Sequence, residues 1–182
     1  MKKITIYSFI IVLLSLTGCS KFLERLPDNR TELNSVDKVS QLLGTAYPQA
    51  NYMDFCESMS DNVDDKGVGE MDITNTDSYF FKVVADNQQD SPEYYWDACY
   101  AAVAAANHAL EACNEAPNPG DYTSQKGEAL VARAYAHFML VTLFSKIYDP
   151  ATAASDPGIP YVTESEKVVI KEYDRKTVAY VY

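Results

Sequence analysis

The chain lacks the short motifs by which several classes of enzyme and metal site are recognised. Neither G-x-S-x-G nor H-E-x-x-H occurs, so nothing points to a serine hydrolase or a zinc protease. No C-x-x-C is present, and the two histidines, His108 and His137, are isolated on helical stretches where we expect packing or surface roles. No group of cysteines and histidines has the spacing of a zinc site. We therefore expect no catalysis, no metal and no cofactor.

Positive charge is also scarce. The 182 residues hold 15 Lys and Arg against 26 Asp and Glu, which gives a formal net charge of −11 at pH 7. Because a surface of this sign repels phosphate groups, we expect no nucleic-acid partner. Aromatic residues are abundant by contrast, with 14 Tyr, 7 Phe and 1 Trp. This composition suits the binding of neutral polar ligands such as sugars or peptides.

The apolar run at the N-terminus, residues 4–16, is too short to span a bilayer, which takes about 20 apolar residues. It follows two lysines and ends in Leu16-Thr-Gly-Cys19, and this order is typical of a secretory signal. The Gly-Cys junction is similar to a bacterial lipobox, in which the cysteine is acylated and becomes the first mature residue. We therefore expect a lipoprotein signal peptide at 1–18 and membrane attachment through lipid chains such as palmitate on Cys19. The alternative is an ordinary signal peptide that happens to contain a cysteine.

Removal of the signal peptide leaves 164 residues, enough for one domain with a core. Residues 19–34 are polar and read as a tether, followed by a helical domain over 35–182. Within that domain, apolar spacing and capping residues predict four helical segments. They are a short helix that starts behind Asn34 or Ser35 and ends near Pro48, a long helix from Ser91-Pro92 to about Glu115, a second long helix from Thr123 or Ser124 to about Tyr148, and a third helix that begins at Asp174.

The two long helices are separated by a proline-rich turn, which predicts an antiparallel hairpin of tetratricopeptide type. The second helix is apolar on two sides, so we expect it to be buried between partners, with Arg133 as a structural ion-pair residue. The fold class is therefore all-α, with long irregular loops. Residues 78–84 are apolar enough for a short strand or an anchored loop, and residues 167–173 are strand-like.

The segment 49–91 holds ten acidic residues against Lys66 and Lys82 and has no sustained period. The acidic cluster Asp61–Gly67 resembles a calcium-binding loop in composition. It does not match the EF-hand pattern, because Val63 stands where that pattern has a ligand and Lys66 stands where it has glycine. A solvated acidic loop is our interpretation, and calcium binding stays open as the alternative. No metal site is assigned.

Tyr79, Phe80 and Phe81 are the candidate ligand-binding residues, because loop aromatics can stack on the faces of sugars. The alternative is that the three rings anchor the loop to the helical frame. Nothing in the sequence fixes the distances between the carboxylates of Glu57, Asp61 and Glu70. We therefore do not pair them as catalytic residues.

Three cysteines follow Cys19. Cys99 and Cys113 lie 14 positions apart on one predicted helix, about 20 Å along its axis, so they cannot pair with each other. A disulfide between Cys56 and either Cys99 or Cys113 stays open as an alternative. We expect all three to be small buried hydrophobic residues.

Several motifs, taken in order, resemble the N-terminal region of the SusD/RagB family of surface lipoproteins. The resemblance covers nearly all of the mature chain. After the Gly-Cys junction, the motifs are Phe22-Leu23-Glu24-Arg25-Leu26-Pro27, Leu42-Leu43-Gly44-Thr45-Ala46-Tyr47, Trp96-x-x-x-Tyr100, Ala106-Asn107-x-x-Leu110, Gly127-Glu128-Ala129-Leu130-Val131-Ala132-Arg133-Ala134-Tyr135, Asp156-Pro-Gly-Ile-Pro160 and Arg175-Lys-Thr-Val178.

The resemblance implies an outer-membrane lipoprotein that faces the cell exterior and is built from tetratricopeptide-like helix pairs. It implies binding of glycans, or of peptides in some branches, and their delivery to a TonB-dependent transporter of the SusC type, on which such proteins act as a lid. Family members are much longer, so the chain is expected to be an incomplete N-terminal region. The alternative function is a lipid-anchored tetratricopeptide-like scaffold of the cell envelope.

Overall fold

The computed structural model describes residues 32–67, 69, 72–168 and 171–182. The predicted signal peptide, Cys19 and almost all of the predicted tether therefore lie outside the described residues. Leu33–Tyr182 form one compact unit. No helix in the described part of the chain is long and apolar enough to cross a membrane.

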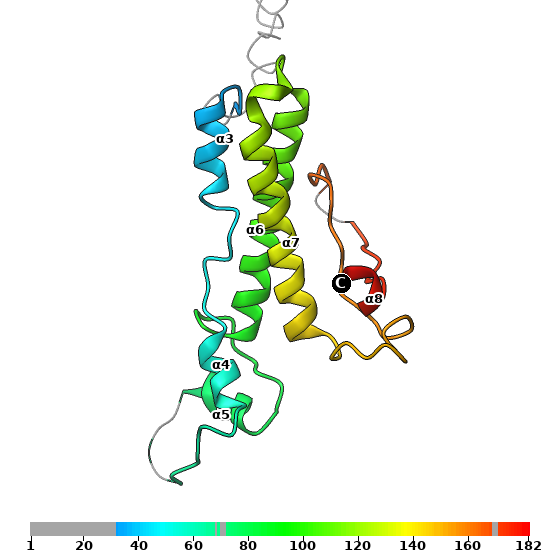
Figure 1. The fold of residues 1–182 in the computed structure, drawn as a ribbon. Helices are drawn as coiled ribbons and strands as arrows, with labels where there is room; N and C mark the ends of the chain where they lie inside the picture. Colours follow the sequence, from blue (N-terminus) through cyan, green and yellow to red (C-terminus); the bar gives the residue numbers. More distant parts are fainter. Residues whose placement is uncertain (1–31, 68, 70–71, 169–170) are drawn as a thin grey trace, which may run out of the picture. The chain divides into compact units, whose positions relative to one another are not determined.

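All regular elements in the described residues of this unit are helices, which confirms the all-α fold (Figure 1). In chain order they are α3 (Val36–Leu43), α4 (Met53–Ser58), α5 (Ile73–Tyr79), α6 (Pro92–Glu115), the short 3-10 helix η1 (Pro119–Tyr122), α7 (Thr123–Phe144) and α8 (Val178–Val181). Among the described residues, β-pairing is limited to an isolated bridge between Pro157 and Thr177.

Helices α3 and α6 begin where the capping residues predict. Ser91 accepts a hydrogen bond on Oγ from the backbone N of Tyr94 at 3.1 Å, and Pro92 occupies the first turn of α6. Such a cap satisfies one of the amide groups that a helix start leaves without a partner. Ser35 caps α3 in the same way, through a hydrogen bond from the backbone N of Lys38 at 3.3 Å. Both predicted starts are confirmed.

Helices α6 and α7 form the predicted antiparallel hairpin, joined through η1 (Figure 1). Alanines line much of their contact, and the small side chains let the two backbones approach closely. Helix α3 packs against both α6 and α7 and adds Val39 and Leu43 to the same core. The fully buried alanines of this core are Ala46, Ala106, Ala109, Ala129 and Ala132.

Helix α7 differs from its prediction in two respects. It ends at Phe144 and not at Tyr148, because Ser145 adopts an extended backbone with φ −126° and ψ 175°. Only one of its two apolar stripes is buried, since α6 and α3 cover one side of it. On the other side Leu130 is 44% exposed and Phe138 is 50% exposed. The prediction that α7 is buried between partners on both sides is therefore wrong for the described part of the chain.

The connecting segments hold more structure than their composition predicts. Two short helices, α4 and α5, interrupt the segment 49–91. Helix α5 is capped by Asp72, whose Oδ1 accepts a hydrogen bond from the backbone N of Thr74 at 2.8 Å. No strand forms at 78–84, nor in the described residues of 167–173.

The third predicted helix begins four residues late. Asp174 forms a turn instead, in which its carboxylate accepts a hydrogen bond from the backbone N of Lys176 at 2.9 Å. Lys176 has φ 56°, which is incompatible with continuing a right-handed helix. Helix α8 therefore starts at Val178, behind Thr177 as its cap.

The three cysteines in the described part of the chain have free thiols. Cys99 and Cys113 are buried in α6, as expected for small hydrophobic residues, and Cys56 is half-buried. Burial raises the pKa of the Cys99 thiol to about 11. A thiol in such surroundings stays protonated and unreactive at neutral pH.

Candidate functional site

A buried amide holds the segment that follows α7 against the α6–α7 hairpin. Asn107, only 2% exposed, donates from Nδ2 to the carbonyl oxygens of Val162 at 3.3 Å and Glu164 at 3.2 Å. Its Oδ1 accepts a hydrogen bond from Nη1 of Arg133 at 2.8 Å, and the same nitrogen donates to the Thr163 carbonyl at 3.0 Å. Arg133 joins the segment to the hairpin, but its partners are an amide and a carbonyl and not the predicted ion-pair partner.

His137 makes a second connection to this segment. The backbone N of Val162 donates to Nε2 of His137 at 3.1 Å, so Nε2 must carry the lone pair. The proton therefore sits on Nδ1, which lies 2.9 Å from the Arg133 carbonyl and donates to it. Burial lowers the pKa of His137, against the opposing effect of the hydrogen bond to the Arg133 carbonyl. The ring is neutral at pH 7 and has both nitrogens satisfied, which agrees with a packing role.

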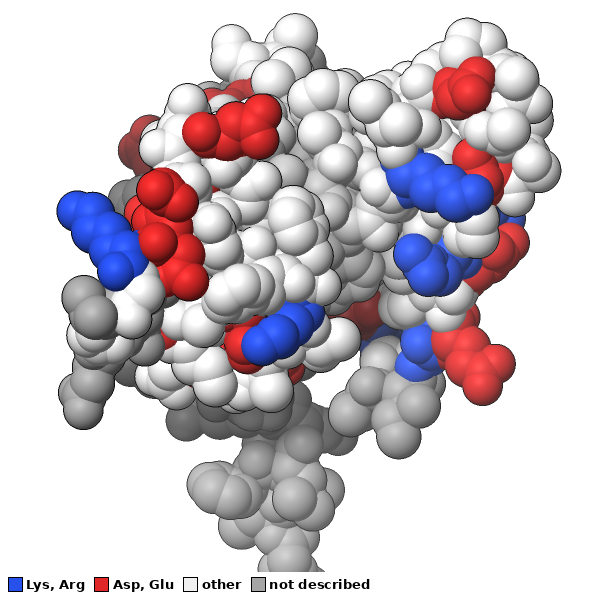
Figure 2. Space-filling view, turned by 90° about the horizontal axis from the view of Figure 1, so that it is seen from below, with Lys and Arg blue, Asp and Glu red and all other residues white. Residues whose placement is uncertain are grey.

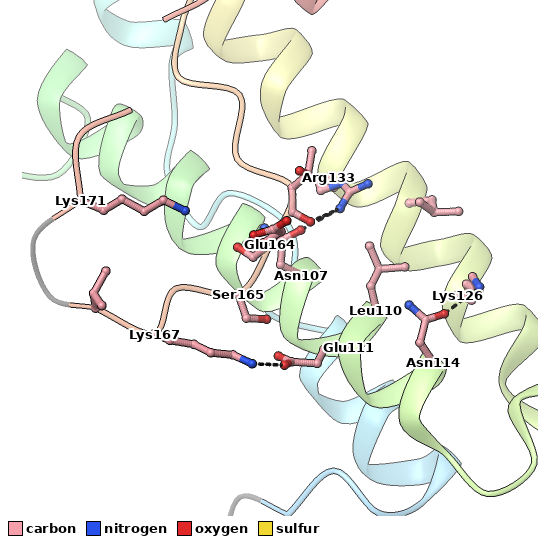
Figure 3. Close-up of a pocket in the computed structure, with 13 residues that line it drawn as sticks. Asn107, Leu110, Glu111, Asn114, Lys126, Arg133, Glu164, Ser165, Lys167 and Lys171 are labelled. Atoms are coloured by element: carbon pink, nitrogen blue, oxygen red, sulfur yellow. Dashed lines mark hydrogen bonds and ion pairs between the residues drawn. The ribbon is translucent and has the colours of Figure 1, made fainter. Parts of the chain in front are cut away.

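Between the hairpin and this segment lies a hollow of about 620 Å³, which we call the polar pocket (Figure 3). Its volume falls within the range of about 300–1,000 Å³ that is typical of ligand sites. Helices α6 and α7 form one wall, and the segment after Val162 forms the other. Its lining residues are Asn107, Leu110, Glu111, Asn114, Lys126, Leu130, Arg133, Thr163, Glu164, Ser165, Lys167, Val168 and Lys171.

Two contacts cross or border the polar pocket. Lys167 reaches from the segment to α6, where its Nζ lies 2.9 Å from Oε1 of Glu111 (Figure 3). This hydrogen bond lowers the pKa of Glu111 and raises the pKa of Lys167, so both groups are charged at neutral pH. Between the helices, Nζ of Lys126 donates to Oδ1 of Asn114 at 2.8 Å.

A second hollow of about 290 Å³, the aromatic pocket, lies on the other side of Glu164. The rings of Trp96 and Tyr100 lie 5.1 Å apart, centre to centre, and the Tyr100 hydroxyl donates to the Pro160 carbonyl at 2.9 Å. The Tyr173 hydroxyl donates to Glu166, which raises the pKa of Tyr173 to about 12. The lining residues are Trp96, Asp97, Tyr100, Val103, Ala104, Pro160, Val162, Glu164, Glu166 and Tyr173.

The two pockets share Glu164 and together line one side of α6. Aromatic rings offer apolar faces, whereas carboxylates such as Asp97 and Glu164 accept hydrogen bonds from hydroxyl groups. The combination of an aromatic pocket and a neighbouring polar one matches a ligand with both apolar faces and hydroxyls, as a sugar ring has. Among the described residues, no group of three or more His, Cys, Asp or Glu side chains is placed to hold a metal ion.

The predicted ligand-binding residues Tyr79, Phe80 and Phe81 lie elsewhere, at the end of α5. Phe80 is 49% exposed and Phe81 is 76% exposed, so neither anchors the loop to the hairpin. The Tyr79 and Phe80 rings meet edge to face at 5.0 Å, and Nζ of Lys82 lies 5.0 Å from the centre of the Phe80 ring. The three aromatic residues line neither the polar nor the aromatic pocket.

The acidic loop beside α5 is exposed from Asp61 to Gly67. Its Asp65 carboxylate accepts a hydrogen bond from the backbone N of Gly67 at 2.7 Å, and the backbone N of Asp65 donates to the Tyr79 hydroxyl at 3.3 Å. Seen from the end of the molecule at which α4 and α5 lie, acidic side chains form separate patches, and Lys and Arg lie mostly beside them (Figure 2). This arrangement agrees with a solvated acidic loop.

Sequence reasoning missed both pockets. The spacing Trp96-x-x-x-Tyr100 places two aromatic rings on one helix face, a signal that could have indicated the aromatic pocket. Nothing in the sequence indicates that residues 160–166 and Tyr173 fold back over α6 to complete it. That contact joins positions about 60 residues apart.

Comparison with protein-family models matches residues 21–182 to a SusD-like family, described as starch-binding and associating with the outer membrane. A search of curated proteins finds no match. The matched region contains all the described helices and both pockets. The family is one of binding proteins that associate with the outer membrane. By this match the chain belongs to the SusD/RagB family, as its motifs predict.

Proposed function

We propose that the protein is a lipid-anchored outer-membrane receptor that binds glycans, or peptides in a variant of the same role. It holds them on the side of α6 that carries the aromatic and polar pockets. It then delivers them to a TonB-dependent, SusC-like transporter. Cys19, acylated after removal of residues 1–18, keeps the receptor at the exterior face of the outer membrane.

The observation that carries the glycan-binding part is the pairing of the two pockets at Glu164. In the aromatic pocket, Trp96 is half-buried and held by Tyr100 and Phe144, whose ring centres each lie 5.1 Å from its own. A ring fixed in this way loses little side-chain freedom when a sugar stacks on it. Asp97 and Glu164 are exposed beside it and can accept hydroxyl hydrogen bonds.

Tyr79, Phe80 and Phe81 remain proposed as a further aromatic platform for the ligand. Their support is the exposure of Phe80 and Phe81. Phe81 also has φ 52°, a backbone conformation that is uncommon for a residue with a side chain. Strained residues often occur at functional positions. Substitution of Phe81 by Ala should weaken glycan binding, whereas substitution of Val83, which is more exposed still, should not.

Binding is tested by titrating the detergent-solubilised protein with linear oligosaccharides from starch, xylan and pectin. Asp97→Asn should weaken binding of the preferred glycan about fivefold, because one hydrogen bond to a charged group is weakened. Glu93→Gln is the matched control, since Glu93 lies one turn earlier on α6, is exposed and lines neither pocket. It should leave the affinity unchanged.

The result that contradicts the proposal is binding of none of these glycans while the protein is recovered with a protein partner alone. That outcome favours the envelope scaffold. Recovery with a TonB-dependent transporter after mild detergent extraction is expected, and consistent recovery of the receptor by itself counts against delivery. We expect no glycosidase or peptidase turnover, and measurable turnover by the purified protein would overturn that expectation.

A further inference from the structure

Positive side chains are concentrated around the polar pocket of an otherwise acidic protein. Ten Lys and Arg residues occur in the described part of the chain, and four of them line this pocket, namely Lys126, Arg133, Lys167 and Lys171. They come from two sides, because Lys126 and Arg133 lie on α7 whereas Lys167 and Lys171 lie on the opposite segment (Figure 3). Two carboxylates, Glu111 and Glu164, also line the pocket, so cations exceed anions by two.

Only one of these four cations is paired with a carboxylate among the described residues. Lys167 and Glu111 neutralise each other at 2.9 Å. Lys126 contacts the uncharged amide of Asn114, and Nζ of Lys171 lies 5.0 Å from the centre of the Tyr173 ring. Lys126, Arg133 and Lys171 therefore have no carboxylate within ion-pair distance in the described part of the chain. Glu164 is the remaining carboxylate that lines the pocket, while Glu115 and Glu166 lie outside its lining.

The guanidinium of Arg133 is held in place by two hydrogen bonds within the protein. Its Nη1 is held by Oδ1 of the buried Asn107 and by the Thr163 carbonyl. No described residue accepts a hydrogen bond from its Nε or Nη2, so that edge of the guanidinium keeps its donors. A planar guanidinium binds a carboxylate through two parallel hydrogen bonds, and fixing it beforehand reduces the entropy lost on binding.

We propose that the polar pocket binds the carboxylate groups of an acidic oligosaccharide, that is, a glycan containing uronic acid units. This inference rests on the proposed function and names the class of glycan. Arg133 binds one carboxylate through its free edge, and Lys126 and Lys171 provide positive charge on either side. The pocket thus selects a ligand of opposite charge although the protein as a whole is acidic.

A uronate chain fits these two pockets better than an acidic peptide does. Its sugar rings present apolar faces to Trp96 and hydroxyls to Asp97 and Glu164, whereas the side chains of a polyacidic peptide offer neither group. The uronate carboxylate is the group that the polar pocket can accept. The two neighbouring pockets therefore match two different parts of one ligand.

The test compares hexagalacturonate, maltohexaose and hexaglutamate by titration of the full, detergent-solubilised chain. At low salt, hexagalacturonate should bind at least tenfold more tightly than maltohexaose. This advantage should shrink in about 0.5 M NaCl, because exposed charges are screened. Tighter binding of hexaglutamate, or equal binding of the charged and neutral sugars, overturns the inference.

The pocket is located by a pair of double variants with equal changes in net charge. Lys126→Gln with Lys171→Gln should weaken hexagalacturonate binding about fivefold or more, through the loss of two exposed ion pairs, and change maltohexaose binding less than twofold. Lys38→Gln with Lys66→Gln is the control, since neither residue lines either pocket. Equal weakening by both double variants would show a general charge effect and overturn the assignment.

Circular dichroism and thermal unfolding establish that both double variants are folded. The inference and the proposed function fail differently. Binding of neutral glycans without preference for uronate leaves the receptor function in place and removes the inference. Binding of no glycan removes both.

Discussion

At the scale of single residues, two buried polar side chains decide how the pockets are built. Asn107 uses both amide hydrogens and its oxygen, and His137 uses both ring nitrogens. A buried polar group without its partner costs about 1–3 kcal/mol, so these networks fix one position of the segment after α7. Arg133 gains its orientation from this network and not from its own helix.

The protonation of His137 makes a pH dependence of stability predictable. Its pKa is lowered in the folded state, so the unfolded chain binds the proton more readily. The contribution of the neutral ring is therefore fully present above the unfolded pKa of about 6.5 and is lost as the pH falls below it. The loss is at most about 1.4 kcal/mol per pH unit until the folded pKa is reached.

Thermal unfolding between pH 7.5 and pH 5.5 measures this effect. The wild-type melting temperature should fall over this interval, and His137→Gln should flatten the fall because Gln does not titrate. His108→Gln is the matched control, since the His108 side chain is 51% exposed. An unchanged slope in His137→Gln would show that other groups cause the pH dependence.

At the scale of elements, local sequence signals decide the long helices. Ser91 and Pro92 start α6, and the apolar spacing extends it to Glu115, so both of its ends are predictable. Where a helix depends on a single local contact, prediction is less accurate. Asp72 starts α5 in a segment without apolar periodicity, and the turn at Asp174 delays α8.

Gly158 holds α8 in place by allowing a close approach of two backbones. Its N donates to the Lys176 carbonyl at 3.1 Å, and its carbonyl accepts a hydrogen bond from Nε of Arg175 at 2.9 Å. A Cβ atom at this position would lie 2.8 Å from the carbonyl carbon and oxygen of Thr177. Because backbone atoms cannot move aside as a flexible side chain can, any larger residue must push the two segments apart.

Two Gly→Ala variants with opposite expected effects test this contact. Gly158→Ala should lower the free energy of unfolding by about 1–3 kcal/mol, as overpacking does. Gly127→Ala should raise it by about 0.5–1 kcal/mol, because Gly127 lies within α7 and a Cβ there meets no atom within 4 Å. Chemical denaturation measures both, and equal effects of the same sign would contradict the structural explanation.

At the scale of the whole molecule, the proposed function requires both membrane attachment and a ligand-binding face. The family match supports association with the outer membrane, whereas the means of attachment rests on the sequence at Leu16-Thr-Gly-Cys19. Lys126, Arg133 and Lys171 show that the local charge of a pocket can oppose the net charge of the chain. The net charge of the chain therefore does not indicate the local charge of a pocket.

Attachment through Cys19 predicts a change of cell fraction on mutation. The mature protein should begin at Cys19 and carry fatty acyl chains, which mass spectrometry of the N-terminal peptide detects. Cys19→Ala should move the protein from the outer-membrane fraction to the soluble fraction or leave its signal peptide uncleaved, because the substitution removes the thiol that carries the lipid anchor. An unmodified N-terminus in the membrane-bound protein would contradict the lipoprotein assignment.

The sequence by itself determined the all-α class, the caps at Ser35 and Ser91, the α6–α7 hairpin and the family. These features depend on contacts between residues close in the chain, where apolar period and capping groups act directly. Tertiary structure decided which stripe of α7 is buried and which polar groups meet. Asn107 lies 26 positions from Arg133 and 55 from Val162, and no local pattern specifies contacts at such separations. The two pockets exist because the chain after α7 returns to α6, and only folding brings those residues together.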